Sequence, residues 1–341
     1  MKATLHILCS PTKPVHVLNR TDPFSIAVIK FVENMTKLDW NCVVYTIPGS
    51  DLPCEYVLCL QFINNQNGYN IEEYNRQAGL EIQKRKKPGD MIMCFHGWEN
   101  QSATNANRDL HIVEPSIGYD IKAIFAPHRA FTSYAQMHMY YGYKDMLMNP
   151  SWFDAVIPNA FSANEFDYND SKEDYLLMFG RVIENKGIHI AIQASEQTGH
   201  TLVIAGPGTL GDLGYSTIPN HVEYVGICNV EQRRQLMSKA KAILGPTYYV
   251  EPFGNMIVES YFSGTPAITT DWGGFVDTVV NGHTGFRCRE FKDFVSAIEN
   301  IDTIKPLDCF EYAMGNYEET VVHKQFDEYF LKIKEGNFYR K

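Results

Sequence analysis

Short apolar runs bounded by turn residues alternate with longer amphipathic stretches along this 341-residue chain. The alternation is typical of parallel strands joined by crossover helices, so it predicts an α/β fold. In the first half, the expected strands cover residues 4–9, 42–45, 56–61, 91–95 and 112–114, and the expected helices cover 26–38 and 71–87. In the second half, with helices between them, the expected strands cover 175–179, 201–205, 222–225, 242–244 and 267–269.

The length of the chain predicts about two domains, since a domain commonly has roughly 100–200 residues. Residues 164–174 are polar, acidic and without apolar periodicity, so we expect a linker there. The expected domains cover 1–164 and 165–315, and residues 316–341 form a last segment. The apolar pattern of residues 311–335 indicates a helix, which we expect to cross back onto the first domain.

The charge of the chain is −10 and lies mainly in the second half. Residues 1–160 hold 14 Lys and Arg against 15 Asp and Glu (−1), and residues 161–341 hold 16 against 25 (−9). Binding to duplex nucleic acid needs many Lys and Arg side chains set against phosphates. We therefore expect no nucleic-acid partner, and the balance also argues against a polyanionic substrate.

The cysteine pattern and the hydropathy of the chain indicate the cellular compartment in which we expect the protein. The eight cysteines are scattered without a Cys-x-x-Cys pair, which indicates reduced thiols. There is no signal-peptide pattern and no apolar stretch near the ~20 residues that span a membrane, so we expect a cytoplasmic protein. The basic run at 84–87 could contact anionic lipid as a peripheral membrane site. We favour the alternative, in which these cations complement a helix dipole and remain solvated.

The segment GPGTLG at 206–211 matches the Gly-x-Gly-x-x-Gly pattern of dinucleotide-binding folds directly after an expected strand. In that fold a helix begins at the third glycine and directs its amides at a pyrophosphate. The following residues contain Gly214 and Pro219 and have no helical period. The segment is therefore interpreted as a plain glycine-rich loop.

The segment FGRVIENKGI at 179–188 is an expected strand end, a loop with two cations and the start of a helix. Exposed amides at a helix start favour an anion, and Arg181 and Lys186 lie at that point. A diphosphate would suit them. Two ordinary solvated charges on a loop explain the pattern about as well.

The stretch from 246 to 274 carries two glutamates around the start of another helix. Pro252 and Gly254 keep the chain irregular after Glu251, and Asn255 can begin a helix that includes Glu259. Carboxylates accept hydrogen bonds from paired hydroxyls and free amides hold phosphate, so a sugar-diphosphate-ribose ligand would suit this arrangement. The alternative, acids favoured by the helix dipole, explains Glu251 well and Glu259 poorly.

These segments together resemble the retaining glycosyltransferase family 4. The run from Glu251 to Glu259 is similar to its Glu-x7-Glu signature, and GRVIENKG is similar to its phosphate loop. Further similarity lies in VIPNAF, LVIAGPG, VEYVG and SGTPAITTDWGGFVDTVVNGHTGF, so the resemblance covers roughly residues 155–290 in order. It implies a GT-B fold, in which two Rossmann-like domains with parallel sheets face an active site in the cleft between them.

The resemblance also implies roles for individual residues. Arg181 and Lys186 would bind the donor diphosphate, and Glu259 would hold the ribose hydroxyls. Glu251 would contact the transferred sugar together with the backbone amides of three following residues, namely Phe253, Gly254 and Asn255. Asp277 stands where the family commonly has Glu.

The first half resembles the family less well. Its loop at 9–25 lacks the glycine-rich turn that many members have after the first strand, and it contains Asp22, an acceptor-side candidate. The run at 111–142 resembles a subgroup in which Glu114 ends a strand at the cleft, as a catalytic and acceptor-side residue. Arg129, Ser133 and His138 would lie near Glu114 on the acceptor side. Each of them alone is more commonly a structural residue, and a lone His in a Tyr- and Met-rich stretch is commonly packed in a core.

The chain has no Asp-x-Asp and no His-Glu-x-x-His motif, so we expect no metal and no other cofactor. The charge on a leaving nucleoside diphosphate would then be stabilised by Arg181, Lys186 and helix-start amides. The resulting hypothesis is a retaining glycosyltransferase that moves a sugar from a UDP- or GDP-linked donor to a hydroxyl of a glycan or glycoconjugate. The alternatives are a GT-B epimerase or phosphorylase, and a catalytically silent sugar-nucleotide-binding protein.

Overall fold

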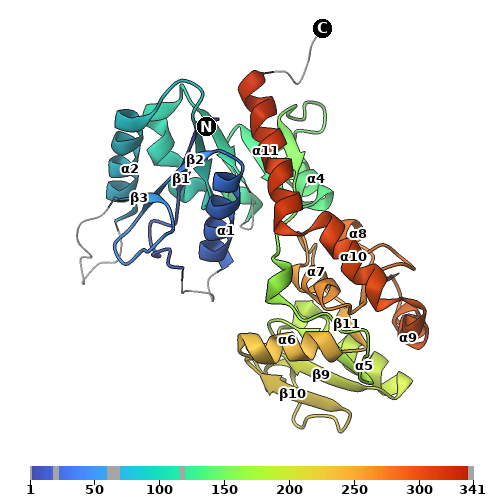
Figure 1. Ribbon diagram of the computed structural model, residues 1–341. Coiled ribbons are helices and arrows are strands. Elements are labelled where there is room, and N and C mark those ends of the chain that lie inside the picture. Colours follow the sequence, from blue (N-terminus) through green and yellow to red (C-terminus); the bar gives the residue numbers. More distant parts are fainter. Residues whose placement is uncertain (1, 18–22, 60–69, 116–119, 337–341) are drawn as a thin grey trace. The chain divides into compact units, whose positions relative to one another are not determined.

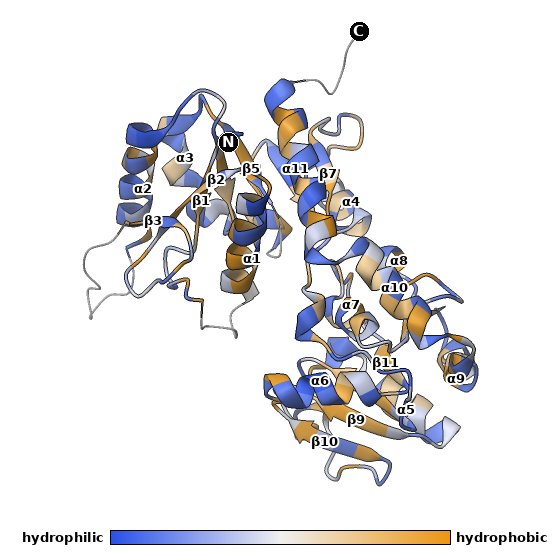
Figure 2. Ribbon diagram, viewed as in Figure 1, coloured by the Kyte–Doolittle hydropathy of each residue, from blue (hydrophilic) through white to orange (hydrophobic). Residues whose placement is uncertain are grey.

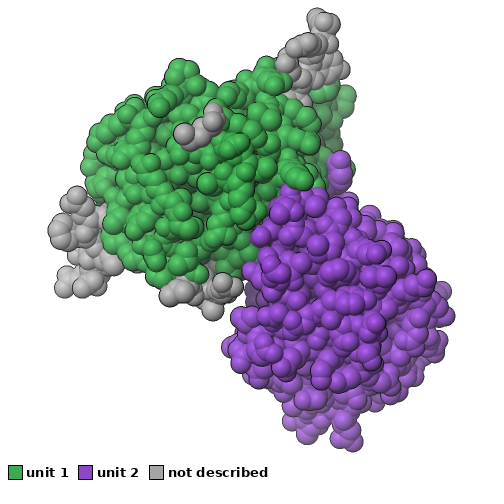
Figure 3. Space-filling model, viewed as in Figure 1, with its two compact units in different colours: residues 1–132, 137–160, 322–341 green, residues 133–136, 161–321 purple. Residues whose placement is uncertain are grey.

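The computed structural model describes residues 2–17, 23–59, 70–115 and 120–336. The chain divides into two compact units (Figure 3), and each is described by itself. Unit 1 comprises residues 1–132, 137–160 and 322–341, and unit 2 comprises residues 133–136 and 161–321. Each unit holds one parallel sheet with helices around it (Figure 1), so the predicted α/β class is confirmed.

The sheet of unit 1 has seven parallel strands in the order β3-β2-β1-β4-β5-β6-β7. They are β1 Thr4–Leu8, β2 Asn41–Thr46, β3 Glu55–Leu58, β4 Met91–Cys94, β5 His111–Glu114, β6 His128–Phe131 and β7 Asp154–Val156. The first five match predicted strands, and β6 and β7 were not predicted. Strands β1 and β4 are buried on both faces, which explains why most of their residues are apolar.

The helices of this part of the chain are α1 Pro23–Lys37, α2 Ile71–Arg85, α3 Gln101–Thr104 and α4 Tyr134–Tyr143, the last of which begins in unit 2. The amide of Glu73 donates to the side chain of Asn70, which caps the start of α2. Acidic residues in the first turn of α2 and basic residues in its last turn complement the helix dipole. The predicted helices at 26–38 and 71–87 are confirmed, with α2 ending two residues early.

Two hydrophobic clusters cover the two faces of the unit 1 sheet. Leu5 and Ile7 of β1 join one cluster, and Leu8 joins the other, as the alternation of side chains along a strand requires. Phe326 and Phe330 also belong to the first cluster. They lie on α11 (Glu319–Glu335), whose residues from 322 onward are part of unit 1.

The predicted continuous helix over 311–335 is wrong, because two helices, α10 Pro306–Asn316 and α11, occupy this region. Between them, the amide of Phe161 donates to Tyr317 O at 2.9 Å and the amide of Glu319 donates to Phe161 O at 2.8 Å. These bonds use backbone groups that a continuous helix would need for its own ladder. The break is therefore imposed by a segment more than 150 residues away in sequence.

The sheet of unit 2 has six parallel strands in the order β10-β9-β8-β11-β12-β13. They are β8 Tyr175–Phe179, β9 Thr201–Ala205, β10 Val222–Gly226, β11 Ala242–Gly245, β12 Ala267–Thr270 and β13 Gly285–Cys288. The first five confirm the predicted strands, and β13 was not predicted. The helices of unit 2 before α10 are α5 Ile188–Thr198, α6 Val230–Lys239, α7 Asn255–Phe262, α8 Phe275–Thr278 and α9 Phe291–Glu299.

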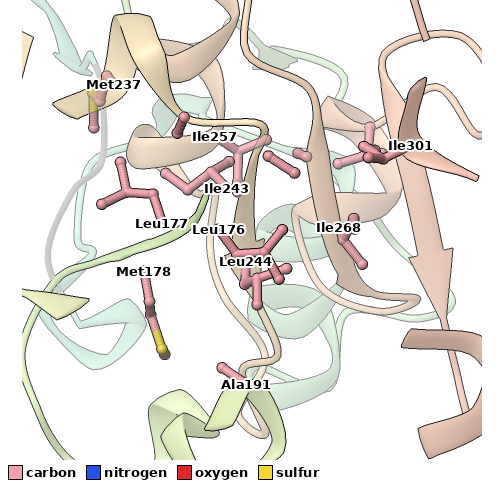
Figure 4. Packing of buried hydrophobic residues seen from close by; sticks show 14 of the residues in the cluster. Leu176, Leu177, Met178, Ala191, Met237, Ile243, Leu244, Ile257, Ile268 and Ile301 are labelled. Carbon is pink, nitrogen blue, oxygen red and sulfur yellow. The ribbon is translucent and has the colours of Figure 1, made fainter. Parts of the chain in front are cut away.

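The core of unit 2 lies between its sheet and its helices. Figure 4 shows Leu176 and Leu177 of β8 among Ile243 and Leu244 of β11, with Ile257 of α7 nearby. All five side chains are fully buried. Figure 2 shows the hydropathy of each residue. Strands β9 and β10 of unit 2 are mostly hydrophobic, and helix α2 of unit 1 is mostly hydrophilic.

The connection from β9 to β10 contains no α-helix, and its only regular turn is a short 3₁₀-helix, Gly211–Leu213. The absence of a helical period after residues 206–211 is confirmed, so the general expectation of helices between the strands of the second half does not hold at this connection. The interpretation of 206–211 as a plain loop is confirmed. Within the described residues, no helix has the length and apolarity needed to traverse a bilayer.

Candidate functional site

The predicted donor residues of unit 2 follow two neighbouring strands. Strand β11 pairs with β8 in parallel, so their carboxyl ends lie at the same edge of the sheet. Arg181 and Lys186 follow β8, Glu251 follows β11, and Glu259 lies on the next helix, α7. Ligands of open parallel sheets bind at this edge.

A glycine allows the two loops at this edge to meet. Gly187 has φ +73°, and a Cβ at this position would lie 1.9 Å from Pro246 O. In addition, the amide of Tyr248 donates to Asn185 O at 2.9 Å. The backbone contact leaves no space for a side chain at 187, and it fixes Lys186 beside the loop that carries Glu251.

Lys186, Tyr249 and Glu251 form one side-chain cluster. The ammonium Nζ of Lys186 lies 2.8 Å from Oε2 of Glu251, and the two side chains are 15% and 16% exposed. The hydroxyl of Tyr249 donates to the same Oε2 at 2.6 Å, and Lys186 Nζ lies 4.9 Å from the centre of the Tyr249 ring. Burial, reinforced by the bond to Glu251, raises the pKa of Tyr249, so its hydroxyl stays protonated and donates at neutral pH.

Arg181 has a different environment. Its side chain is exposed and lines a pocket of about 840 Å³, together with Glu184, His189, Asp212 and Tyr215. Its positive charge favours the ionised form of Tyr249, although burial outweighs this effect. Within the described residues, Arg181 makes no ion pair, whereas Lys186 is engaged by Glu251.

Glu259 pairs with a residue that was not predicted. Its carboxylate binds the guanidinium of Arg233 on α6, and that guanidinium lies 5.5 Å from the centre of the Phe179 ring at the end of β8. The Nε of Arg233 is buried and has no hydrogen-bond partner among the described residues. The charge of Glu259 is therefore compensated inside unit 2.

The loop between Glu251 and α7 has the predicted irregular form, and α7 begins at Asn255 as predicted. Gly254 has φ +90°, and the Phe253 side chain is buried at 4% exposure, packed on the ring of Phe161. A ligand could therefore meet Phe253 and Gly254 only through their backbone. The side chain of Asn255 is exposed.

Two glycines, Gly273 and Gly274, pack against the backbone of this loop. The amide of Gly274 donates to Glu251 O at 2.6 Å. A Cβ on Gly273 would lie 2.8 Å from the backbone N and O of Glu251, and one on Gly274 would lie 2.6 Å from Pro252 O. Both positions therefore have a steric reason to be glycine.

The side chains of Asp277 and Ser133 accept hydrogen bonds from backbone amides at the start of α4. The amide of Tyr134 donates to Oδ2 of Asp277 at 2.9 Å, and the amide of Gln136 donates to the Ser133 hydroxyl at 3.0 Å. The Ser133 hydroxyl donates in turn to Pro252 O at 2.5 Å. Ser133, expected near Glu114, is thus buried in unit 2, where it caps α4 and contacts the Glu251 loop.

The candidates of unit 1 are held by structural bonds. Glu114 is fully buried, and its carboxylate accepts hydrogen bonds from the amides of Phe125 (3.1 Å) and Ala126 (2.9 Å). Arg129 is 6% exposed, and its Nε lies 2.7 Å from Oδ1 of Asp154. Both side chains therefore have partners within the protein, as buried polar groups require, and their role on the acceptor side stays a prediction.

His138 and Asp22 are the remaining acceptor-side candidates, and residues 84–87 form the basic run. His138 lies on α4 with an exposed side chain, so the alternative of a packed core residue is wrong. Asp22 lies outside the described residues. Of the basic run, Lys84 and Arg85 pair with Glu81 of the same helix and the third cation pairs with Asp109, which agrees with the solvated interpretation. No group of three or more His, Cys, Asp or Glu side chains suited to a metal occurs in the described part of the chain.

Comparison with solved structures defines the class of fold. The glycosyltransferase AviGT4 of avilamycin A biosynthesis superposes with a TM-score of 0.69 at 17% identity, covering 98% of both chains. The Anabaena protein Alr3699/HepE, solved with UDP and glucose, gives 0.67 at 15% identity, covering 96% of this chain and 98% of that one. The fold is that of GT-B glycosyltransferases, as predicted.

Comparison of sequences gives a more specific match for most of unit 2. Residues 162–307 match the family model described as glycosyl transferases group 1. The glycogen synthase of Mycobacterium tuberculosis is 33% identical over 138 residues, which are 37% of this chain and 33% of that protein. The mannosyltransferase RfbU of Salmonella typhimurium is 26% identical over 194 residues, which are 54% of this chain and 52% of that protein.

The matched regions span about a third to a half of the length of these relatives. The family-model match, residues 162–307, contains Arg181, Lys186, Glu251 and Glu259. The sequence matches therefore show a resemblance of residues 162–307 to group 1 glycosyl transferases.

Proposed function

We propose that this protein is a retaining, metal-independent glycosyltransferase. It moves a sugar from a nucleoside-diphosphate sugar to a hydroxyl of a glycan or glycoconjugate. The proposal is carried by one observation: the loops that follow β8 and β11 bring Lys186 against Glu251, with Arg181 on the first loop and Glu259 on the following helix, inside the segment that matches group 1 glycosyl transferases. Cations for a diphosphate and carboxylates for hydroxyls are the groups that such a donor requires.

The donor diphosphate binds Arg181 and Lys186 in this proposal. Arg181 is exposed in its pocket and available for a phosphate. Lys186 exchanges the carboxylate of Glu251 for a phosphate oxygen, which frees Glu251 for a hydroxyl of the transferred sugar. Glu259, oriented by Arg233, accepts hydrogen bonds from the ribose hydroxyls.

The reaction breaks the bond between the anomeric carbon and the diphosphate oxygen. The acceptor oxygen forms its bond to the same face of that carbon, and its proton passes to the departing phosphate, so the configuration is retained. The nucleoside diphosphate leaves with increased negative charge. Arg181, Lys186 and the amides at the start of α7 stabilise that charge as preorganised groups.

The donor panel should begin with UDP- and GDP-linked hexoses. Two similar proteins support this choice, since HepE was solved with UDP-glucose and RfbU is a mannosyltransferase. The assay measures release of UDP or GDP with a range of saccharide acceptors, with and without EDTA. Proton NMR of the product reports the anomeric configuration, and inversion would contradict the proposed mechanism.

Alanine variants test the diphosphate contacts. Arg181→Ala and Lys186→Ala should each lower kcat/KM for the donor by about 10- to 100-fold, because each removes charged hydrogen bonds. Lys292→Ala is the matched control, since that exposed lysine pairs with Glu290 at the start of α9 and should leave kcat/KM unchanged. Full activity of both site variants would overturn the diphosphate assignment. Nucleotide binding without turnover would favour the silent binding protein, and conversion of one sugar nucleotide into another would favour an epimerase.

A further inference from the structure

We propose that Tyr249 is a positioning residue, which holds the carboxylate of Glu251 in place while Lys186 binds the donor diphosphate. The inference rests on the proposed function, and it assigns a role to a residue that no sequence motif marked. Tyr249 lies two residues before Glu251, between the exposed side chains of Tyr248 and Val250. Its own side chain is turned inward and partly buried.

The carboxylate of Glu251 is held through one of its two oxygens. Oε2 accepts both the Tyr249 hydroxyl at 2.6 Å and the Lys186 ammonium at 2.8 Å. Within the described residues, Oε1 forms no hydrogen bond, so its lone pairs remain available for a sugar hydroxyl. The carboxylate is therefore oriented from one side and open on the other.

Tyr249 is itself anchored at its backbone and at its ring. The indole Nε1 of Trp272 donates to Tyr249 O at 3.3 Å, and the Lys186 ammonium lies over the ring at 4.9 Å from its centre. Gly273 packs directly behind Glu251 on the same side of the loop. The hydroxyl thus projects from a fixed base, which a positioning residue needs.

The role of Tyr249 becomes decisive when the donor binds. In the ligand-free protein two donors hold Oε2, and loss of either leaves the other. Once a phosphate draws Lys186 away, the Tyr249 hydroxyl is the remaining hydrogen bond to Oε2 from this cluster. Without it, Glu251 would lose its fixed orientation in the donor complex, where the reaction depends on that orientation.

Tyr249→Phe in the full chain tests this role. The variant keeps the ring under Lys186 and loses the hydroxyl, so kcat should fall about tenfold while the KM for the donor changes less than threefold. Tyr175→Phe is the matched control, because it also removes a hydroxyl in unit 2, one that donates to Leu236 O at 2.7 Å away from the site. The control should keep the wild-type kcat.

A double-mutant cycle separates positioning from a general structural effect. In the Glu251→Gln background, Tyr249→Phe should have little further effect on kcat, because the residue acts through the Glu251 carboxylate. Independent, multiplicative losses in the two variants would overturn the inference, as would a wild-type kcat for Tyr249→Phe. If the wild-type protein neither binds nucleotide nor turns over any donor, the proposed function fails and this inference fails with it. Normal turnover by Tyr249→Phe would refute the inference alone.

Discussion

Replacement of Gly274 by alanine should displace the loop that carries Glu251. The added Cβ would lie 2.6 Å from Pro252 O, 2.7 Å from Phe253 Cα and 2.8 Å from Phe253 N. All three are backbone atoms, so no flexible side chain can move aside. Gly274 has φ −63° and ψ −15°, which alanine adopts without strain, so the substitution isolates the steric effect.

The size of the effect follows from these distances. The shortest contact is about 0.8 Å below the 3.4 Å at which ordinary contact begins, so the loop must shift by most of an ångström. Overpacking of this kind costs about 1–3 kcal/mol, offset by about 0.4–1 kcal/mol from the smaller entropy of the unfolded chain. We expect a net loss of about 1–2 kcal/mol in the free energy of unfolding. A misplacement of about 1 Å can cost about 100-fold in rate, so kcat should fall at least tenfold.

Urea unfolding and donor turnover measure the two effects. The matched control is Gly315→Ala in α10, where the new Cβ would meet no atom of the described residues within 4 Å beyond its own helix. Alanine inside a helix is favoured over glycine, so this control should gain about 0.5–1 kcal/mol and keep the wild-type kcat. A Gly274→Ala protein with the wild-type unfolding midpoint and wild-type turnover would refute the steric argument.

Two further outcomes are expected. First, burial lowers the pKa of His128 from 6.5 to about 4, so its neutral form is favoured in the folded protein and stability falls as the pH drops from about 7 toward 4. The full shift corresponds to about 2 kcal/mol lost between pH 8 and pH 5, and with partial exposure of the ring we expect about 1 kcal/mol from His128. By urea unfolding, the loss should be smaller by about this amount in His128→Asn and unchanged in the exposed-site control His138→Asn. Second, Glu251→Gln should bind UDP or GDP about threefold more tightly by calorimetry, because Lys186 no longer has a carboxylate partner, while its kcat falls to a low but measurable level. Weaker nucleotide binding by Glu251→Gln would contradict the proposed exchange of partners.

Much of the fold could be predicted because its central strands are buried on both faces. Strands β8 and β9 have the predicted bounds, since a continuous apolar run between turn residues marks such a strand clearly. The strands that were missed are short and carry polar residues: β6 contains His128 and Arg129, and β13 contains Arg287. The buried Arg129 pairs with Asp154, which lies on the adjacent strand, and this pairing is a property of the sheet.

In the candidate site, too, some residues can be recognised from the local sequence and others only from the folded chain. Arg181, Lys186, Glu251 and Glu259 could be selected because loop position and spacing are local properties of the sequence. Arg233 could not, because its pairing with Glu259 has no fixed spacing and arises only when α6 and α7 pack.

Polar residues at a strand end are ambiguous for a related reason. Glu114 has the position of a ligand-binding residue, yet its carboxylate binds the amides of Phe125 and Ala126. A sequence shows the polar group at the strand end, and only the folded chain shows which partner satisfies it.

The acidic excess of the second half, −9 over residues 161–341, is compatible with a diphosphate site under the proposed function. At the edge of β8 and β11, Lys186 is paired with Glu251 and Arg233 with Glu259, so Arg181 supplies the uncompensated charge of the five. Distant acids are screened beyond about 8 Å at physiological ionic strength and weigh little against contacts at 3 Å. Under the proposed function a bound diphosphate contacts Arg181 directly and also takes Lys186 from Glu251. That exchange delivers the carboxylate to the sugar at the moment the phosphate is bound, so the pair that neutralises the empty site also couples donor binding to readiness for transfer.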